Sequence, residues 1–235
     1  MYIIKEIQKI ANKIDGYLHD REGQLLYNLA KKCKGRGVIV EIGSWKGKST
    51  VWLAKGSKAG KGVKIYAVDP HTGGYEHKKF GEISTFEEFK RNIEKSQVND
   101  IVIPLVKTSR DAAKNFNQPV ELIFIDGDHE YEAVKLDFEL WFPRLISGGI
   151  MAFHDVISHP GPKKVVKEFV YKSRSFRNIK FVDSIVYAEK TGANSLRDRL
   201  KNKFVFFLNN IYEFGHKLKS HLPQSVKKIG KKIIG

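Results

Sequence analysis

The chain has 235 residues, 41% of them hydrophobic and 11% aromatic, enough to bury a full core in one domain with an appendage. A single cysteine, Cys33, excludes an intramolecular disulfide and any zinc or iron–sulfur centre held by several thiolates. The net charge of +16 favours an anionic partner, either nucleic acid or an anionic membrane surface.

Two further features favour a cytoplasmic location. The first stretch, MYIIKEIQKIANKIDGYL, alternates apolar with charged residues and lacks the continuous apolar run of a signal peptide. No segment reaches the roughly 18 to 20 uninterrupted apolar residues of a membrane-spanning helix. We therefore expect a cytoplasmic protein whose basic tail allows contact with the inner face of a membrane.

Helices and strands are predicted to alternate along the chain. Apolar residues recur at helical spacing within 3–34, and short β-branched runs then alternate with further helical patterns. The predicted strands are 38–43, 63–69, 101–107, 121–126, 148–155 and 179–190. The later predicted helices are 49–57, 86–98, 110–116, 131–145 and 163–173. Residues 71–85 follow neither period and carry three glycines, which predicts a long loop that forms a lid or binding surface.

This alternation predicts an α/β fold, with a doubly wound, mostly parallel sheet covered by helices on both faces. Ligands of such sheets bind at the carboxyl ends of the strands. We divide the chain into a catalytic domain, residues 1–190, which includes the N-terminal helices, and a basic helical tail, residues 191–235.

The stretch EIGSWKGKST, residues 41–50, is nearly a phosphate-binding loop of the form G-x-x-x-x-G-K-[ST], but it has one residue too few between its glycines. Glu41 ends the preceding strand, where a carboxylate would repel a triphosphate. Asp69 ends the next strand, roughly 20 to 25 residues after the loop, as in carboxylates that bind ribose hydroxyls. The loop and Asp69 together favour an adenosine ligand without phosphates. A P-loop-like nucleotide-binding protein is the alternative.

Polar side chains follow two further strands. FIDGDHEYEA places Asp126, Asp128 and His129 after one strand, and MAFHDV places His154 and Asp155 after the next. Adjacent parallel strands lie about 4.8 Å apart, so the two groups are expected to converge. Oxygen-rich ligands with imidazoles suit Mg²⁺ or Mn²⁺. The alternative interpretation of FIDGDHEYEA is a helix N-terminus at which Asp128 is the capping residue.

At these motifs the chain resembles the class I S-adenosylmethionine-dependent methyltransferases, in the small O-methyltransferase branch with the catechol-type and sugar-modifying enzymes. VEIGSWKGKSTVWLA is similar to that branch's first motif, E-x-G-x-x-x-G-x-S-T, and the resemblance continues through AVDPHTG, LVKTSRDAA and LIFIDGDHEYEAVK to cover about residues 20–190. It implies a seven-stranded sheet. It also implies that S-adenosylmethionine is bound by Glu41, Gly43, Ser44, Gly47, Ser49, Asp69, Ser109, Arg110 and Asp126.

The resemblance also assigns roles. The counterpart of Asp69 holds the ribose, Ser49 would touch the cofactor carboxylate, and Ser109 and Arg110 would lie by the adenine. The catechol-type metal site uses an Asp-Asn pair, and the aligned residues here are Asp155-Val156. The sugar-modifying relatives instead use an acidic residue followed by an aspartate, which aligns with His154-Asp155. The resemblance to the sugar-modifying relatives implies that Asp126, His154 and Asp155 hold a divalent cation, Mg²⁺ or Mn²⁺, and that His129 is the general base.

The predicted function is therefore methyl transfer to a hydroxyl of a sugar, a glycan or a similar small-molecule vicinal diol. Nucleic-acid methylation is the competing methyl-transfer hypothesis, but its usual [DN]-P-P-[YF] motif is replaced here by IDGDH, which disfavours a nucleic-acid partner. A non-catalytic scaffold that retains the fold is a third alternative.

The tail concentrates the positive charge. After residue 195 there are ten Lys and Arg against two acids, a net +8. Apolar residues from Leu200 to Leu218 follow a helical stripe, and SVKKIGKKIIG, residues 225–235, repeats the pattern in short form. This composition favours a helix lying in an anionic membrane surface. The alternatives are packing on the chain's own domain, packing on a second subunit in a homo-oligomer, and RNA binding.

Overall fold

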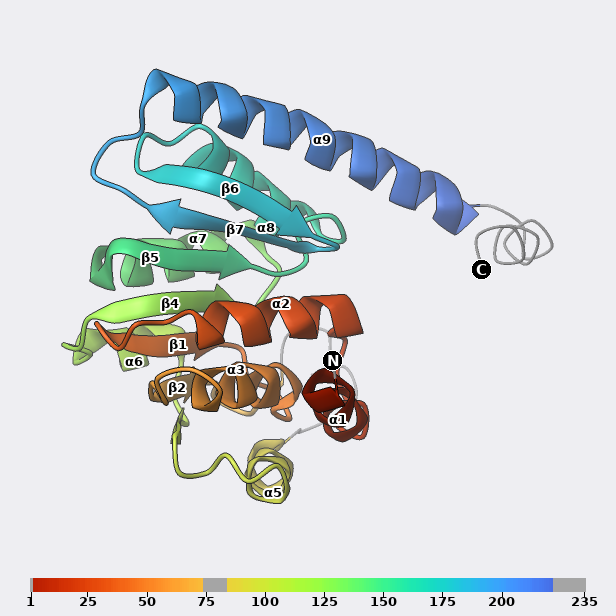
Figure 1. Ribbon diagram of the computed structural model, residues 1–235, viewed down its shortest axis with the longest axis vertical. Helices are drawn as coiled ribbons and strands as arrows, with labels where there is room; N and C mark the ends of the chain where they lie inside the picture. Colours follow the sequence, from red (N-terminus) through yellow and green to blue (C-terminus); the bar gives the residue numbers. More distant parts are fainter. Residues whose placement is uncertain (1, 74–83, 222–235) are drawn as a thin grey trace.

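One mixed sheet of seven strands organises the molecule. The computed structural model describes residues 2–73 and 84–221 (Figure 1). The strand order is β3-β2-β1-β4-β5-β7-β6, and all pairs are parallel except those of β7, which is antiparallel to both its neighbours. The strands are β1 (Val38–Ile42), β2 (Ile65–Val68), β3 (Val102–Leu105), β4 (Val120–Ile125), β5 (Leu145–Phe153), β6 (Phe176–Val182) and β7 (Ile185–Lys190). The predicted doubly wound, mostly parallel sheet is confirmed.

Helices cover both faces of the sheet (Figure 1). One face carries α1 (Tyr2–Ala11), α2 (Asp20–Lys31), α3 (Lys48–Lys58) and α5 (Phe86–Lys95). The other carries α6 (Ser109–Lys114), α7 (Tyr131–Trp141) and α8 (Pro160–Val165), which continues as a π-helical segment, Val166–Tyr171. The predicted helix 131–145 ends early, at Trp141, where a short 3₁₀ turn, Phe142–Arg144, that contains Pro143 follows α7. The last helix, α9 (Leu196–His221), runs beside β6.

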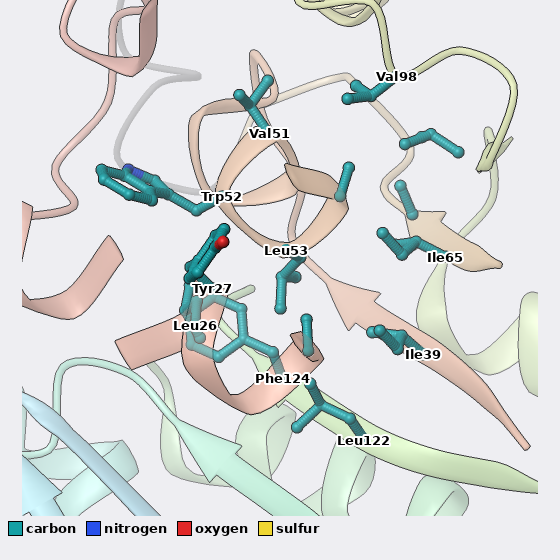
Figure 2. Close-up of a cluster of buried hydrophobic side chains, with 14 of the residues drawn as sticks. Leu26, Tyr27, Ile39, Val51, Trp52, Leu53, Ile65, Val98, Leu122 and Phe124 are labelled. Carbon is teal, nitrogen blue, oxygen red and sulfur yellow. The ribbon is translucent and has the colours of Figure 1, made fainter. Parts of the chain in front are cut away.

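The central strands have apolar side chains on both faces because both are covered. In β4 every residue is buried: Leu122 and Phe124 join the core under α2 and α3 (Figure 2), whereas Ile123 and Ile125 join the core under α6 and α7. This period of two is the alternation expected of a strand.

One predicted strand is divided in the structure, and two other predicted segments lie wholly or mostly outside the described residues. Residues 179–190 form parts of two strands, because Asp183 turns the chain with a positive φ of 49°. Most of the predicted loop 71–85 lies at residues 74–83, outside the described residues. The predicted short helix at 225–235 also lies outside them. Among the helices that are described, none combines the length and the apolar character needed to cross a bilayer.

A buried carboxyl group lies in the middle of the sheet. Glu41 alternates with Val40 and Ile42 on β1, so its side chain lies on the α3 side, where it is fully buried and accepts a hydrogen bond from the Thr50 hydroxyl. Its second oxygen has no hydrogen-bond partner among the described residues. Burial, reinforced by the nearby carboxylates Asp126 and Asp69, raises the pKa of Glu41 from 4.5 to about 8.

We predict that Glu41 makes the protein less stable as the pH rises. The folded state binds this proton more tightly than the unfolded state, so the contribution of Glu41 to the free energy of unfolding is highest below pH 4.5. It falls as the pH approaches 8, by about 1.4 kcal/mol per pH unit. In urea unfolding between pH 5 and pH 8, Glu41→Gln should therefore gain stability relative to the wild type as the pH increases. Exposed Glu132→Gln is the control; a wild-type pH slope in Glu41→Gln would contradict the prediction.

Candidate active site

A cavity of about 870 Å³ opens at the carboxyl ends of the parallel strands. Its walls come from the turns that follow β1, β2, β4 and β5, from the start of α6, and from the segment between α1 and α2. The predicted site residues that line it are Gly43, Ser44, Ser49, Asp69, Ser109, Arg110, Asp126, His129, His154 and Asp155. Glu41 and Gly47 do not line it. The Glu41 carboxyl group lies under α3 and accepts a hydrogen bond from Thr50, contrary to the expectation that it would face the ligand.

The two loop glycines are required by the backbone. Gly43 has a φ of +87°, and a side chain there would collide with the carbonyl oxygen of Asp126. Gly47, at φ +92°, is the N-cap of α3, which directs the start of that helix toward the cavity. Between them lies Ser44, a residue of the cavity wall whose buried hydroxyl oxygen has no partner among the described residues. A ligand group that donates or accepts a hydrogen bond fits this position.

The lysine that would contact phosphate in a P-loop has a different role here. The amine of Lys48 donates to the carbonyl of Gly16, 2.9 Å away, and so ties the start of α3 to the segment between α1 and α2. This contact agrees with the interpretation of the glycine loop as a site for a ligand without a triphosphate.

Asp69 joins two turns and still faces the cavity. Its carboxylate accepts the backbone N–H groups of Trp45, at 2.8 Å, and His71, at 2.6 Å. Each carboxylate oxygen can accept a second hydrogen bond, so the group can also bind the hydroxyls of a ribose. The predicted ribose position is thus rigidly held by the backbone that surrounds it.

The start of α6 and the inner face of α7 form another wall. Thr108 caps α6 and accepts the N–H of Asp111, and the hydroxyl of Ser109 accepts a hydrogen bond from the Trp141 indole, 2.9 Å away. Asp137, on α7, is buried and lines the same wall. Burial raises the pKa of Asp137 to about 6. The sequence analysis did not identify Asp137, because it lies in a helix whose inner face is otherwise apolar.

The ends of β4 and β5 meet, as the parallel register predicts. His154 Nδ1 lies 2.9 Å from Asp126 Oδ1 and 3.2 Å from Asp155 Oδ2. His129 Nε2 lies 3.2 Å from the same Asp155 oxygen. His154 is buried, whereas about a third of the His129 side chain is exposed, so His129 is the imidazole that an incoming ligand can reach.

A carboxylate from the N-terminal region completes this cluster. Glu22, on α2, is buried, lies 3.3 Å from His154 Nε2, and accepts the N–H of Ser184. Burial alone would lower the pKa of His154, but Asp126, Asp155 and Glu22 outweigh it and raise that pKa well above 6.5. The carboxylates that enclose His154 therefore favour its protonated form.

Two members of the cluster were missed by the sequence analysis. Glu22 is 132 residues from His154 along the chain, and in sequence it resembles an ordinary acid in the first turn of a helix. His159 stacks on His129 with ring centroids 4.0 Å apart, and its Nδ1 lies 3.8 Å from Asp155. The only sequence signal for His159 is its place just before the proline that starts α8.

The capping interpretation of Asp128 is wrong. The N-cap of α7 is Glu130, and Asp128 instead accepts the N–H of Glu130 at 2.9 Å, which shapes the turn before the helix. His129 lies between these two residues and points its imidazole toward Asp155.

Comparison with known proteins agrees with this geometry. Residues 40–156, about half the chain, match the family model of a methyltransferase domain. The protein y4gI of Sinorhizobium fredii is 30% identical over 119 residues, which are 50% of this chain and 13% of y4gI. A second curated relative is matched over 57% of its length, so the chain spans well under two thirds of both proteins.

The fold is shared with solved O-methyltransferases. The O-methyltransferase NovP superposes with a TM-score of 0.62 at 18% identity, over 73% of this chain and 80% of NovP. TomG of Streptomyces achromogenes, an O-methyltransferase solved with S-adenosylmethionine, has a TM-score of 0.57 at 16% identity over 80% of this chain and 89% of TomG. The chain contains a domain of the methyltransferase family whose model matches residues 40–156, and it has the fold of these solved O-methyltransferases.

Proposed function

We propose that the protein transfers the methyl group of S-adenosylmethionine to a hydroxyl of a sugar, a glycan or a similar vicinal diol. The observation that carries the proposal is the His129–Asp155 pair, 3.2 Å apart, in the same cavity as the glycine loop and Asp69. One end of the cavity thus has the groups to hold the methyl donor, and the other has a base beside hydrogen-bonding side chains.

The cofactor end fits an adenosine ligand with a methionine tail. Asp69 has acceptor capacity for the ribose hydroxyls, and Ser109 and Arg110 line the wall assigned to the adenine. Ser44 and Ser49, at the loop and the start of α3, offer hydroxyls to the methionine carboxylate. When bound, S-adenosylmethionine supplies a methyl group on a positively charged sulfur.

His129 is the proposed general base. With its Nε2–H donated to Asp155, the ring is held in the tautomer whose Nδ1 carries the lone pair. As the acceptor oxygen forms its bond to the methyl carbon and the carbon–sulfur bond breaks, Nδ1 takes the proton of the hydroxyl. The products are the methyl ether, the demethylated cofactor and a protonated His129, whose charge Asp155 stabilises.

The donor set also fits a divalent cation. Asp126, His154 and Asp155 offer two carboxylates and one imidazole whose ligand atoms all lie within 4.8 Å of one another. These residues would hold Mg²⁺ or Mn²⁺, and the ion would polarise the acceptor hydroxyl. His154 would hold the ion through the lone pair of its Nδ1, which has to be unprotonated for this.

The charge at the acceptor end favours a sugar over nucleic acid. Asp126, Asp128, Glu130 and Asp155 line this part of the cavity together with His129. Carboxylates accept hydrogen bonds from several hydroxyls at once, whereas they repel the phosphates of a nucleic-acid backbone. The overall positive charge of the chain is therefore no argument for an RNA substrate at this site.

The first prediction for this function concerns the cofactor. Calorimetric titration should show binding of S-adenosylmethionine and of its demethylated product but not of Mg-ATP, because Lys48 is held by Gly16. Asp69→Asn should weaken both interactions by about tenfold or more, whereas exposed Glu132→Gln should leave them unchanged. Binding of ATP alone would reject the proposal in favour of a P-loop-like protein, and no binding at all would favour a scaffold.

The second prediction concerns the base. With tritiated S-adenosylmethionine and a panel of vicinal-diol sugars, His129→Gln should lower kcat by about 10²–10⁴-fold, because proton transfer is lost. Its affinity for the cofactor should stay at the wild-type value, since His129 lies at the acceptor end. Glu132→Gln, an exposed position on α7, the helix that follows His129, is the matched control. Near-normal turnover by His129→Gln would remove the base assignment.

The third prediction concerns the metal. Electron paramagnetic resonance should detect one bound Mn²⁺ per chain, and Asp155→Asn should weaken its binding by about 10–100-fold. Asp100→Asn is the control, because that carboxylate lies on the surface beside Lys58. If the wild type binds no Mn²⁺ and stays active after chelation, the metal assignment fails while the role of His129 stands.

A further inference from the structure

The last helix packs on the domain through its polar side. Asn202, Asn209 and Glu213 are almost fully buried, with 2%, 5% and 6% of their surface exposed. Asn202 donates to the carbonyl of Phe176 at the start of β6, and Glu213 pairs with Lys163 of α8. The docking face of α9 is therefore held by hydrogen bonds and an ion pair together with partly buried aromatic rings.

The apolar side of the same helix faces away from the domain. Seven large side chains recur every three or four residues and so lie along one face of the helix. Each of them has between 53% and 70% of its surface exposed: Leu196, Leu200, Phe204, Phe207, Ile211, Phe214 and Leu218. In Figure 1, α9 lies at the edge of the molecule beside β6, with one side open. We call these seven residues the α9 stripe.

This orientation is the reverse of that expected for a helix that covers a core. A soluble domain hides the apolar side of a surface helix, and a continuous exposed stripe of this length marks a binding surface. The helix does pack on the chain's own domain, as one alternative expected, but through its polar side, so the seven members of the stripe are exposed.

We infer that the α9 stripe inserts into the surface of an anionic lipid bilayer. Basic residues lie on both sides of the stripe, among them Arg197, Lys201 and Lys203. The two acids of the helix are engaged elsewhere: Asp198 accepts hydrogen bonds from Ser195, and Glu213 faces the domain. An apolar stripe bordered by cations is the composition of a helix that lies in the headgroup region of anionic lipids.

The same charges disfavour a second copy of the chain as the occupant. Two α9 stripes packed face to face would bring the basic borders of both helices together, and like charges at an interface oppose association. Anionic headgroups instead neutralise these borders while the large side chains enter the acyl boundary.

The direction of α9 relates this surface to the active site. Asn202 contacts the first residue of β6, and the Tyr212 hydroxyl donates to Asp183, just past the end of that strand. Because β6 runs parallel to β5, the C-terminal turns of α9 reach the edge of the sheet where the cavity opens. On the proposed function, this placement suits an acceptor carried at the membrane surface.

The test is vesicle flotation of the full chain. The wild type should float with phosphatidylcholine vesicles containing about one third phosphatidylglycerol, and less with pure phosphatidylcholine or at about 0.5 M salt. The triple variant Phe204→Gln/Phe207→Gln/Ile211→Gln should lose at least about tenfold in partitioning, because three large apolar side chains no longer enter the bilayer. All three positions are exposed, so the fold should be retained, as checked by thermal unfolding.

Ile3→Gln is the matched control, because Ile3 is also about half exposed but lies on α1. It should float as the wild type does. The inference is overturned if the wild type does not float, or if the triple variant floats equally well. A second copy of the chain is the occupant instead if neither protein floats and light scattering shows that the wild type is a dimer and the triple variant a monomer. None of these measurements depends on methyl transfer.

Discussion

Three backbone hydrogen bonds at the carboxyl edge of the sheet hold the site together. The N–H of Gly43 donates to Val68, that of Asp126 to Ile42, and that of His154 to Ile125, at 2.9, 2.8 and 3.0 Å. They extend the parallel ladders between β1 and β2, between β1 and β4 and between β4 and β5, so the glycine loop, the first carboxylate and the buried imidazole end in line. A register slip of one residue would turn each of these side chains to the other face, and no cavity of this composition would form.

The site gathers charge that the core must tolerate. Glu22, Asp126 and Asp155 surround His154, and Glu41 lies beneath them in the sheet. The cluster persists because burial keeps Glu41 neutral and the three carboxylates keep His154 cationic. Each buried charged group thus has a partner of opposite charge, whereas Glu41, which has no such partner, is neutral.

Sequence patterns were sufficient for the fold, the family and most of the cavity wall, because strand ends and glycine turns carry strong local signals. Glu41 shows where the patterns mislead. It lies near the end of β1, which suggested that its carboxylate faces the ligand, but the alternation along the strand places the side chain beneath α3, against Thr50. Glu22 and His159 were missed because contacts across the fold leave no local period. The amphipathic pattern of α9 was predicted, but a period identifies two faces of a helix without showing which one docks.

The distribution of charge resolves what the net charge of +16 left open. Carboxylates line the acceptor end of the cavity, whereas the basic residues of α9 border an exposed apolar face at the edge of the sheet. A polyanionic substrate would be repelled where the chemistry occurs and attracted only where it does not. The excess positive charge is therefore better explained by the proposed membrane surface than by the proposed acceptor. On the proposed function, the cavity would select a neutral, hydroxyl-rich acceptor, and on the further inference α9 would bind the surface that presents it.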